Sequence, residues 1–320
     1  MKNSLMGDSG FSKYLHVLQD ETFETMSPFL RSLIFRVLRK TKIIDLPLSF
    51  LNKPKSSLTP YSEPNMPKTY SIVVIVSLFI LWEVLFHALS LRWYLLPPPS
   101  MILESIQSNF FSLMGSLAVT LKVTLTALIA SVVISVCLAI IFYFSKFVER
   151  SMMPITVVLQ VTPIIAIAPL ISIWVDSSQM ATLICAFLVA FFPLLTNTIS
   201  GLKSTERNHL DLMKLYRANK YQLLRYVVLP NALPYFLSGL KISAGLALIG
   251  AIVGEFVIGP ISGHSGLAYR IIESGYQLEI PKMFASVFLI SITGILLYNA
   301  VRLLSFMILR NWHSSFSEAE

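Results

Sequence analysis

Two long apolar runs of this chain are separated by a cationic block that ends in proline, DLMKLYRANKYQLLRYVVLP (residues 211–230). Its leucines and valines fall on one side of a helix, while its basic residues occupy the other. Asn219, in mid-block, suits a turn or a helix cap. We therefore expect two short helices along a membrane face, with a bend near residues 217–219. Pro230 and Pro234 are expected to begin the next apolar run.

The pattern alone leaves two interpretations of this block open. It fits an amphipathic loop that lies on lipid. It also fits a docking element, because a short helix pressed into a partner's groove can transmit a push to the segments that it joins. The rest of the chain bears on this choice.

The composition is that of a membrane protein. Of 320 residues, 55% are hydrophobic and only 13% are charged, which is too little charge for the surface of a soluble domain. The net charge of +8 would suggest nucleic acid as a partner in a soluble protein. Here the tendency of cations to collect in cytoplasmic loops accounts for it, so we expect no nucleic-acid partner. Cys137 and Cys185 lie in apolar runs, which argues against a disulfide framework or a thiol site.

Six apolar runs are long enough to cross a bilayer as helices, which takes about 20 residues each. They predict an all-α membrane protein with spans at 70–91, 117–144, 154–175, 180–200, 233–258 and 283–309. Only Asp176 to Gln179 separate the third and fourth spans, so these two should form an antiparallel hairpin.

The basic residues predict the orientation of these spans. An even number of spans places both termini on one side. That side carries ten Lys or Arg residues before Tyr70, two in 145–153, six in 201–232, and Arg310. The opposite loops carry Arg92, Arg270 and Lys282. The positive-inside rule therefore puts both termini and residues 201–232 in the cytoplasm.

Three regions follow from this division. Residues 1–69 are expected to form a cytoplasmic N-terminal extension, residues 70–310 the transmembrane domain, and residues 311–320 a cytoplasmic tail. Within the extension, 29–44 has an apolar stripe opposed by basic residues, which fits an interfacial helix or alternatively a basic tail. Residues 52–68 hold four prolines and predict a linker.

The spacing within the cationic block resembles the cytoplasmic signature of binding-protein-dependent permeases, the membrane subunits of ABC importers. That signature runs Glu-Ala-Ala, three residues, Gly, nine residues, Ile-x-Leu-Pro. Asp211 stands at the Glu position, Arg217 at the Gly position, and Val227, Leu229 and Pro230 at the end. Leu212 and Met213 replace the two alanines. If the glycine position needs a positive φ, Arg217 costs roughly 1 kcal/mol there, unless the turn is built through Asn219.

Further motifs resemble the nitrate/sulfonate/taurine branch of that family, and together they cover about 240 residues from 70 to 310. They are Leu96-Pro97-Pro98-Pro99-Ser100 with Ile102 and Leu103, Gln160 to Pro163 with Ala168-Pro169-Leu170 and Trp174, Leu229 to Tyr235 with Gly239-Leu240-Lys241, Gly254-Glu255-Phe256, and Ser265 to Tyr269.

The resemblance implies a type I ABC importer permease fold in the bacterial inner membrane. It implies a second permease subunit that completes a dimer, separate ATPase subunits that bind the ATP, and a periplasmic or lipid-anchored solute-binding protein. The coupling residues would be Asp211, Arg217, Ala218, Asn219, Lys220, Tyr221, Leu229 and Pro230. Substrates of this branch include nitrate, alkanesulfonates, taurine, bicarbonate, thiamine precursors and riboflavin. A self-sufficient carrier or channel is the alternative.

The motifs of an enzyme are absent from the sequence. There is no Gly-x4-Gly-Lys-Ser/Thr, so we expect ATP to bind a partner and this chain to need no cofactor. The histidines lack the spacing of a metal site. The chain is therefore expected to be a transport subunit without catalytic residues.

Four polar residues within the spans are candidates for a translocation pathway, because charge at membrane depth usually has a partner or a function. Glu83 shares a helix face with His87, so it either forms a local pair or lines a route. Glu255 follows Gly250-x-x-x-Gly254, a spacing that permits close helix packing, and it either forms a structural hydrogen bond or faces a cavity or gate. Gln160 and Thr162 lie beside Pro163, which should break the third span.

Overall fold

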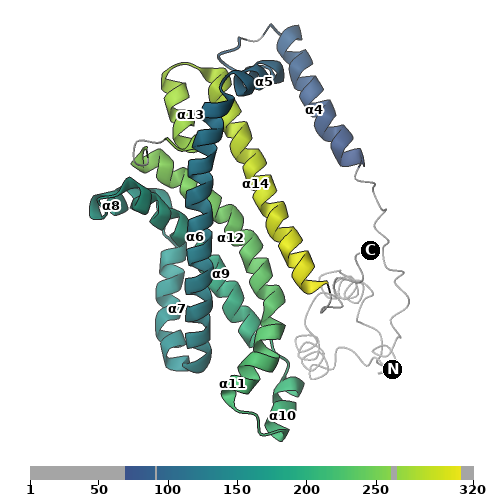
Figure 1. The fold of residues 1–320 in the computed structure, drawn as a ribbon, viewed down its shortest axis with the longest axis vertical. Helices are drawn as coiled ribbons and strands as arrows, with labels where there is room; N and C mark the ends of the chain where they lie inside the picture. The colour runs from purple at the N-terminus through teal and green to yellow at the C-terminus, as the bar shows by residue number, and fades with distance from the viewer. Residues whose placement is uncertain (1–68, 91, 261–264, 311–320) are drawn as a thin grey trace, which may run out of the picture. The chain divides into compact units, whose positions relative to one another are not determined.

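The computed structural model describes residues 69–90, 92–260 and 265–310, and every regular element in these ranges is helical. The expected interfacial helix at 29–44, the linker at 52–68 and the tail at 311–320 lie outside the described residues. The helices, drawn in Figure 1, are α4 (Thr69–Ala88), α5 (Pro99–Ser108), α6 (Phe110–Phe144), α7 (Lys146–Val161), α8 (Ile164–Trp174), α9 (Ser178–Lys203), α10 (Arg207–Leu215), α11 (Lys220–Leu223), α12 (Leu229–Ile258), α13 (Leu267–Tyr276) and α14 (Ile280–Leu309).

Four helices in the described part of the chain are long and apolar enough to cross a membrane. They are α6, α9, the continuous helix Lys220–Ile258 and α14, and they coincide with the second, fourth, fifth and sixth expected spans. The first expected span corresponds to α4, whose apolar part, Val73–Ala88, is shorter. Phe79 of α4 packs edge-on against Phe288 of α14, with ring centroids 5.9 Å apart.

The third expected span, 154–175, is not one straight helix. Helices α7 and α8 meet at a bend of 102°. Thr162 has extended backbone with ψ 124°, because the ring of Pro163 disfavours a helical conformation in the residue before it. The hydroxyl of Thr162 turns back to the carbonyl of Val158 at 2.7 Å. With the bent pair counted as one span, the described residues hold up to five.

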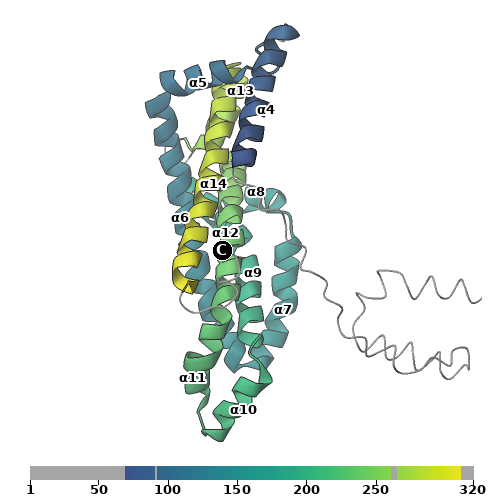
Figure 2. The same cartoon turned by 90° about the vertical axis from the view of Figure 1, so that its right-hand side faces the viewer.

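Helices α9 and α12 form the centre of the bundle, with α6 and α14 beside them in Figures 1 and 2. Glycines allow this close approach. A Cβ at Gly250 would lie 2.7 Å from Cα of Ala186, and a Cβ at Gly254 would lie 2.8 Å from Cγ2 of Thr182. The expected packing role of Gly250-x-x-x-Gly254 is therefore confirmed.

The short helices lie at opposite ends of this bundle. Helices α10 and α11 lie at one end, which we call the basic end, and α5 and α13 lie at the other (Figure 1). At the α5–α13 end, one apolar cluster joins α5, α6, α13 and α14 through Ile102, Leu113, Leu267 and Ala285. The bundle therefore presents two separate sets of short helices to whatever lies on its two sides.

Candidate functional site

The expected bend in the cationic block is present, and Arg217 forms it. Arg217 has φ +52°, a left-handed conformation that favours glycine. The N–H of Arg217 donates to the carbonyl of Lys214 at 2.9 Å, and the N–H of Ala218 donates to the carbonyl of Met213 at 3.0 Å. This pair of bonds closes α10 as a Schellman motif. Arg217 thus occupies the position at which helices most often carry glycine.

Arg217→Gly is expected to stabilise the bend by about 1 kcal/mol, since glycine has no Cβ to strain a positive φ. The gain acts on local order more than on global unfolding, because every residue of α10 is at least partly exposed. Amide hydrogen exchange of residues 213–218 should therefore slow several-fold in the variant. Unchanged or faster exchange would show that the arginine side chain contributes more than the backbone strain costs.

Asn219 begins the next helix. Its Oδ1 accepts from the N–H of Gln222 at 2.8 Å, and the Oε1 of Gln222 accepts from the N–H of Asn219 at 2.9 Å. The two side chains form a capping box, which satisfies two donors at the start of α11. Asn219 therefore acts as the helix cap that its position predicts.

The second half of the block differs from the expectation of a separate short helix. Helix α11 continues through a π-helical turn, Leu224–Val228, directly into α12. The turn ends just before Pro230, which has no N–H and whose ring crowds the preceding helical turn. The helix of the fifth expected span therefore begins at Lys220, before its prolines, and not at residue 233.

One face of this helix is buried and the other is largely exposed. Leu224 and Val228 are buried against Phe142 of α6 and Phe192 of α9. On the other face, Tyr221 is largely exposed, although its ring lies 5.2 Å from that of Phe144 at the end of α6. A displacement of α11 would therefore reach α6, α9 and α12 together.

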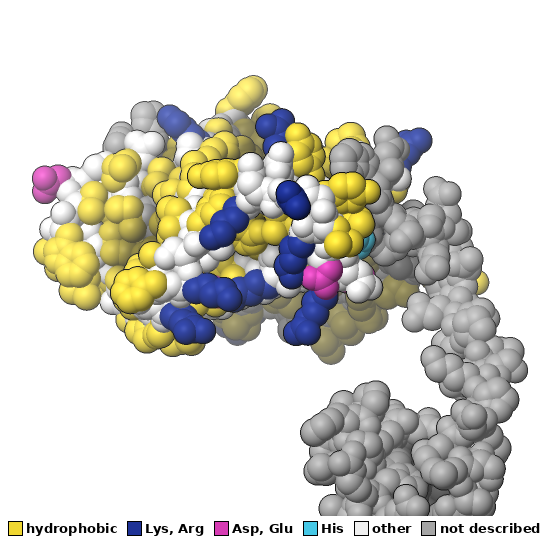
Figure 3. All heavy atoms as spheres, turned by 90° about the horizontal axis from the view of Figure 1, so that it is seen from below, with side chains coloured by type: hydrophobic (Ala, Val, Ile, Leu, Met, Phe, Trp, Pro, Cys, Tyr) yellow, Lys and Arg dark blue, Asp and Glu magenta, His cyan; other side chains and the backbone are white. Residues whose placement is uncertain are grey.

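Helix α10 buries no residue at all. Leu215 is 81% exposed and Tyr216 is 77% exposed. In Figure 3, Lys and Arg side chains lie among apolar ones across the basic end. The described residues that supply this charge include Lys203, Arg207, Lys214, Arg217, Lys220 and Arg225. An amphipathic helix that buries none of its residues and has a basic surround is suited to a docking surface.

The eight expected coupling residues fall in one continuous segment. Asp211 lies on α10 and pairs with Lys214 at 2.8 Å. The bend contains Arg217, Ala218 and Asn219, α11 begins with Lys220 and Tyr221, and α12 begins with Leu229 and Pro230.

Glu255, one of the expected pathway residues, is fully buried at the opposite end. Its Oε1 accepts from the hydroxyl of Thr120 on α6 at 2.8 Å, and its Oε2 accepts from the N–H of Ala268 at 2.9 Å. Ala268 lies in the first turn of α13, whose unpaired N–H groups and dipole favour a carboxylate. Glu255 therefore caps α13 from a neighbouring helix.

The space for this carboxylate depends on glycine and threonine. A Cβ at Gly266 would overlap the carboxyl group of Glu255. Thr120 accepts the N–H of Leu267 at 2.8 Å while it donates to Glu255. The side chain of Glu255 thus connects α6, α12 and α13 in one network of hydrogen bonds.

Glu83 has the same role on a second short helix. Its carboxylate accepts from the N–H of Ser100 at 3.1 Å and from the hydroxyl of Ser100 at 2.8 Å, in the first turn of α5. The expected local pair with His87 is also present at 3.2 Å. The glutamates of α4 and α12 therefore cap the two short helices at this end.

The four pathway candidates do not form one cluster, since no hydrogen bond or ion pair joins any two of them among the described residues. Gln160 is exposed near the end of α7, and Thr162 lies at the bend. The caps' partners, Thr120, Gly266 and Ser100, were missed by sequence reasoning. The sequence offered a signal for Ser100 and Gly266, which stand in a Pro-Ser and a Ser-Gly pair at the start of a short helix, but none for Thr120, which lies inside α6.

Comparison with known proteins identifies the family of this chain. A family described as "Binding-protein-dependent transport system inner membrane component" matches residues 131–310. The chain belongs to this family. It is therefore a multi-pass membrane permease of an ABC importer, a transport subunit and not an enzyme. Members of this family work with ATPase subunits and solute-binding proteins.

Relatives confirm the expected nitrate/sulfonate/taurine branch. The permease is 34% identical over 236 residues to the formylaminopyrimidine transport permease protein ThiX of Halalkalibacterium halodurans, covering 72% of this chain and 91% of that protein. It is 26% identical to the putative aliphatic sulfonates transport permease protein SsuC of Bacillus subtilis, covering 74% and 84%. It is 27% identical to the taurine transport system permease protein TauC of Escherichia coli, covering 77% and 90%.

Solved structures agree in fold. The permease matches a chain of the MetNI methionine ABC transporter, in an inward-facing conformation, with a TM-score of 0.55 and 18% identity, covering 62% of this chain and 97% of that one. It matches a chain of an amino acid ABC transporter with a TM-score of 0.53 and 15% identity, covering 65% and 97%. At these identities the likeness concerns the fold alone.

Proposed function

We propose that the segment from α10 to α11 is the element through which an ATPase subunit drives this permease. The observation that carries the proposal is the contrast between the two halves of the segment. Helix α10 buries no residue, whereas α11 is continuous with a membrane helix. A partner that moves α10 and the bend would thus move α12 directly.

The proposed orientation follows from the basic residues. The permease has six spans in the bacterial inner membrane, with both termini and the basic end in the cytoplasm. In this arrangement ATP binds the partner subunit, and closure of two ATPase subunits tilts α12 with its partner α9. Two permease subunits, which we propose to be identical, then alternate between inward and outward access.

A route through the membrane is the second part of the proposal. The bend between α7 and α8 supports placing Gln160 and Thr162 on it, because broken helices at membrane depth face protein or a water-filled route. We propose that Glu83 and Glu255 act on the route by holding α5 and α13 in place. A solute-binding protein would deliver the substrate at this outer end.

The substrate is proposed from the relatives. Their names specify a formylaminopyrimidine, aliphatic sulfonates, taurine, bicarbonate and riboflavin. We propose a small polar solute of this range, with selection made largely by the solute-binding protein.

Uptake into proteoliposomes tests this function against that of a self-sufficient carrier. With permease, ATPase subunit and solute-binding protein present, uptake of the labelled solute is expected only when ATP is supplied. Uptake that persists without the ATPase subunit, and that an ion gradient drives, would contradict the proposal and favour a carrier.

A further inference from the structure

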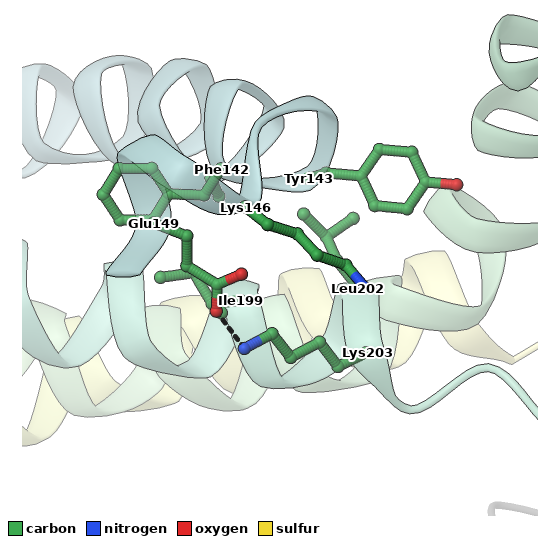
Figure 4. Close-up of a pocket in the computed structure, with 8 residues that line it drawn as sticks. Phe142, Tyr143, Lys146, Glu149, Ile199, Leu202 and Lys203 are labelled. Atoms are coloured by element: carbon green, nitrogen blue, oxygen red, sulfur yellow. Dashed lines mark hydrogen bonds and ion pairs between the residues drawn. The ribbon is translucent and has the colours of Figure 1, made fainter. Parts of the chain in front are cut away.

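A small cavity lies at the basic end, beside the segment from α10 to α11 (residues 207–223), which we call the coupling segment, but separate from it. It has a volume of about 190 Å³ and lies between the end of α6, the start of α7 and the end of α9. Figure 4 shows its lining residues. Its apolar wall includes Phe142, Ile199 and Leu202, and its charged residues are Lys146, Glu149 and Lys203.

The cavity is lined by two lysines and one glutamate, so its positive charges outnumber its negative charge. Lys203 pairs with Glu149, whose side chain is only 16% exposed. Lys146 has no ion-pair partner among the residues that the structure describes. In Figure 4 its side chain extends from α7 toward Leu202, and Lys203 extends from α9 toward Glu149. The cavity therefore carries one net positive charge, held next to an apolar wall.

The surroundings indicate that the cavity opens at a membrane interface and not into bulk water. Phe147, next to Lys146 in the sequence, is 80% exposed, and Ile141 and Phe144 are exposed as well. Such apolar and aromatic side chains beside lysines are typical of the headgroup level of a bilayer.

The size of the cavity also limits its ligand. Pockets that enclose a whole small molecule usually measure about 300–1,000 Å³, so this cavity would hold only part of one. A phospholipid satisfies both conditions, because its headgroup can enter while its acyl chains remain in the bilayer. Basic pockets between membrane helices on the cytoplasmic side favour anionic headgroups.

We propose that the cavity binds the headgroup of an anionic phospholipid, with the phosphate next to Lys146 and Lys203. The glycerol backbone and the first carbons of the acyl chains would lie on Phe142 and Ile199. The proposal rests on the proposed function only for its side of the membrane, the cytoplasmic leaflet. Phe144, which follows the lining residue Tyr143, contacts Tyr221, so a bound lipid would lie near the coupling segment.

Native mass spectrometry of the full chain tests this proposal. The purified permease is offered equal amounts of phosphatidylglycerol and phosphatidylcholine, and the ratio of the two adducts is measured. Lys146→Gln should lower the preference for phosphatidylglycerol about fivefold, the effect of one lysine near an anionic surface. Glu149→Gln should raise it by a similar factor, because it frees Lys203.

Arg150→Gln is the matched control, since it removes one positive charge from the same helix at an exposed residue outside the cavity lining. An equal fall in this variant and in Lys146→Gln would overturn the proposal in favour of general surface attraction. Displacement of the lipid by excess inorganic phosphate would overturn it in favour of a soluble anion. A lower preference in Glu149→Gln would also contradict it.

The test separates the lipid site from the proposed function. Adduct ratios in detergent do not depend on which way the chain faces in a membrane. Capture of the ATPase subunit by the same Lys146→Gln protein reports on coupling. If the wild-type permease captured the ATPase subunit normally but showed no preference for phosphatidylglycerol, the lipid site would be refuted and the proposed function would stand.

Discussion

Glu255→Ala is expected to abolish uptake while leaving the permease inserted and able to bind its ATPase. The substitution removes the cap of α13, so the N–H of Ala268 loses its acceptor and the hydroxyl of Thr120 keeps only the carbonyl of Ser116, at 3.4 Å. Each buried group left unsatisfied costs about 1–3 kcal/mol. The lost hydrogen bonds lie at the α5–α13 end, and the coupling segment precedes the other end of α12. The variant should therefore lose uptake and still bind the ATPase subunit.

Two glycines of the same region provide matched variants. Gly266→Ala should reproduce the loss, because its Cβ would displace the carboxylate of Glu255 although Glu255 itself is unchanged. Gly275→Ala should keep full uptake, since the nearest atom to its Cβ would be the sulfur of Met283 at 3.7 Å. Glu255→Gln keeps one acceptor oxygen and should retain more uptake than Glu255→Ala. Normal uptake in both Glu255→Ala and Gly266→Ala would contradict a role for the cap.

The cationic block shows how far local sequence determines this fold. Asn219 with Gln222 three residues later is a capping box that can be predicted from spacing, and the bend lies where it was expected. The positive φ of Arg217 agrees with the glycine that the family carries there. The continuity of α11 with α12 could not be predicted, because prolines normally start helices and the π-helical turn depends on the burial of Leu224 and Val228.

The bent third span illustrates a second limit. Pro163 predicts a break in the helix, but the angle of 102° is set by the packing of α8 on α9 through Ala168, Ile171, Ala181 and Cys185. The sequence alone predicts that the helix breaks, but not the angle between its two halves.

The glutamates show a third limit, that of distance along the chain. Glu255 meets Thr120, which is 135 residues away, and Glu83 meets Ser100, which is 17 residues away. A charged side chain within a membrane span is energetically costly, so the sequence alone indicated that each glutamate has a function or a partner. Their partners became evident only once the helices were packed.

The second large effect is expected at the basic end. The double substitution Leu215→Glu and Tyr216→Glu should abolish binding of the ATPase subunit. Both side chains are more than three-quarters exposed, so their loss should leave the fold intact. Two carboxylates would replace the apolar side chains of the docking surface and offset part of its positive charge, and removing them from water when the partner covers them costs several kcal/mol. Alanines at Arg217, Asn219, Lys220 and Tyr221 should have the same effect through the bend.

Tyr276→Glu is the control for this pair, since Tyr276 is 87% exposed at the opposite end of the bundle. It changes the same kind of residue at a surface that the ATPase should not reach. Normal insertion of all variants into the membrane would show that the block acts in docking and not in assembly.

Co-purification of the ATPase subunit with tagged permease tests the central claim most directly. We predict that wild type and Tyr276→Glu retain the ATPase, whereas the Leu215→Glu, Tyr216→Glu double variant and the alanine variant of the bend lose it. Retention of the ATPase by both of these variants would contradict the claim that the segment from α10 to α11 is its docking site.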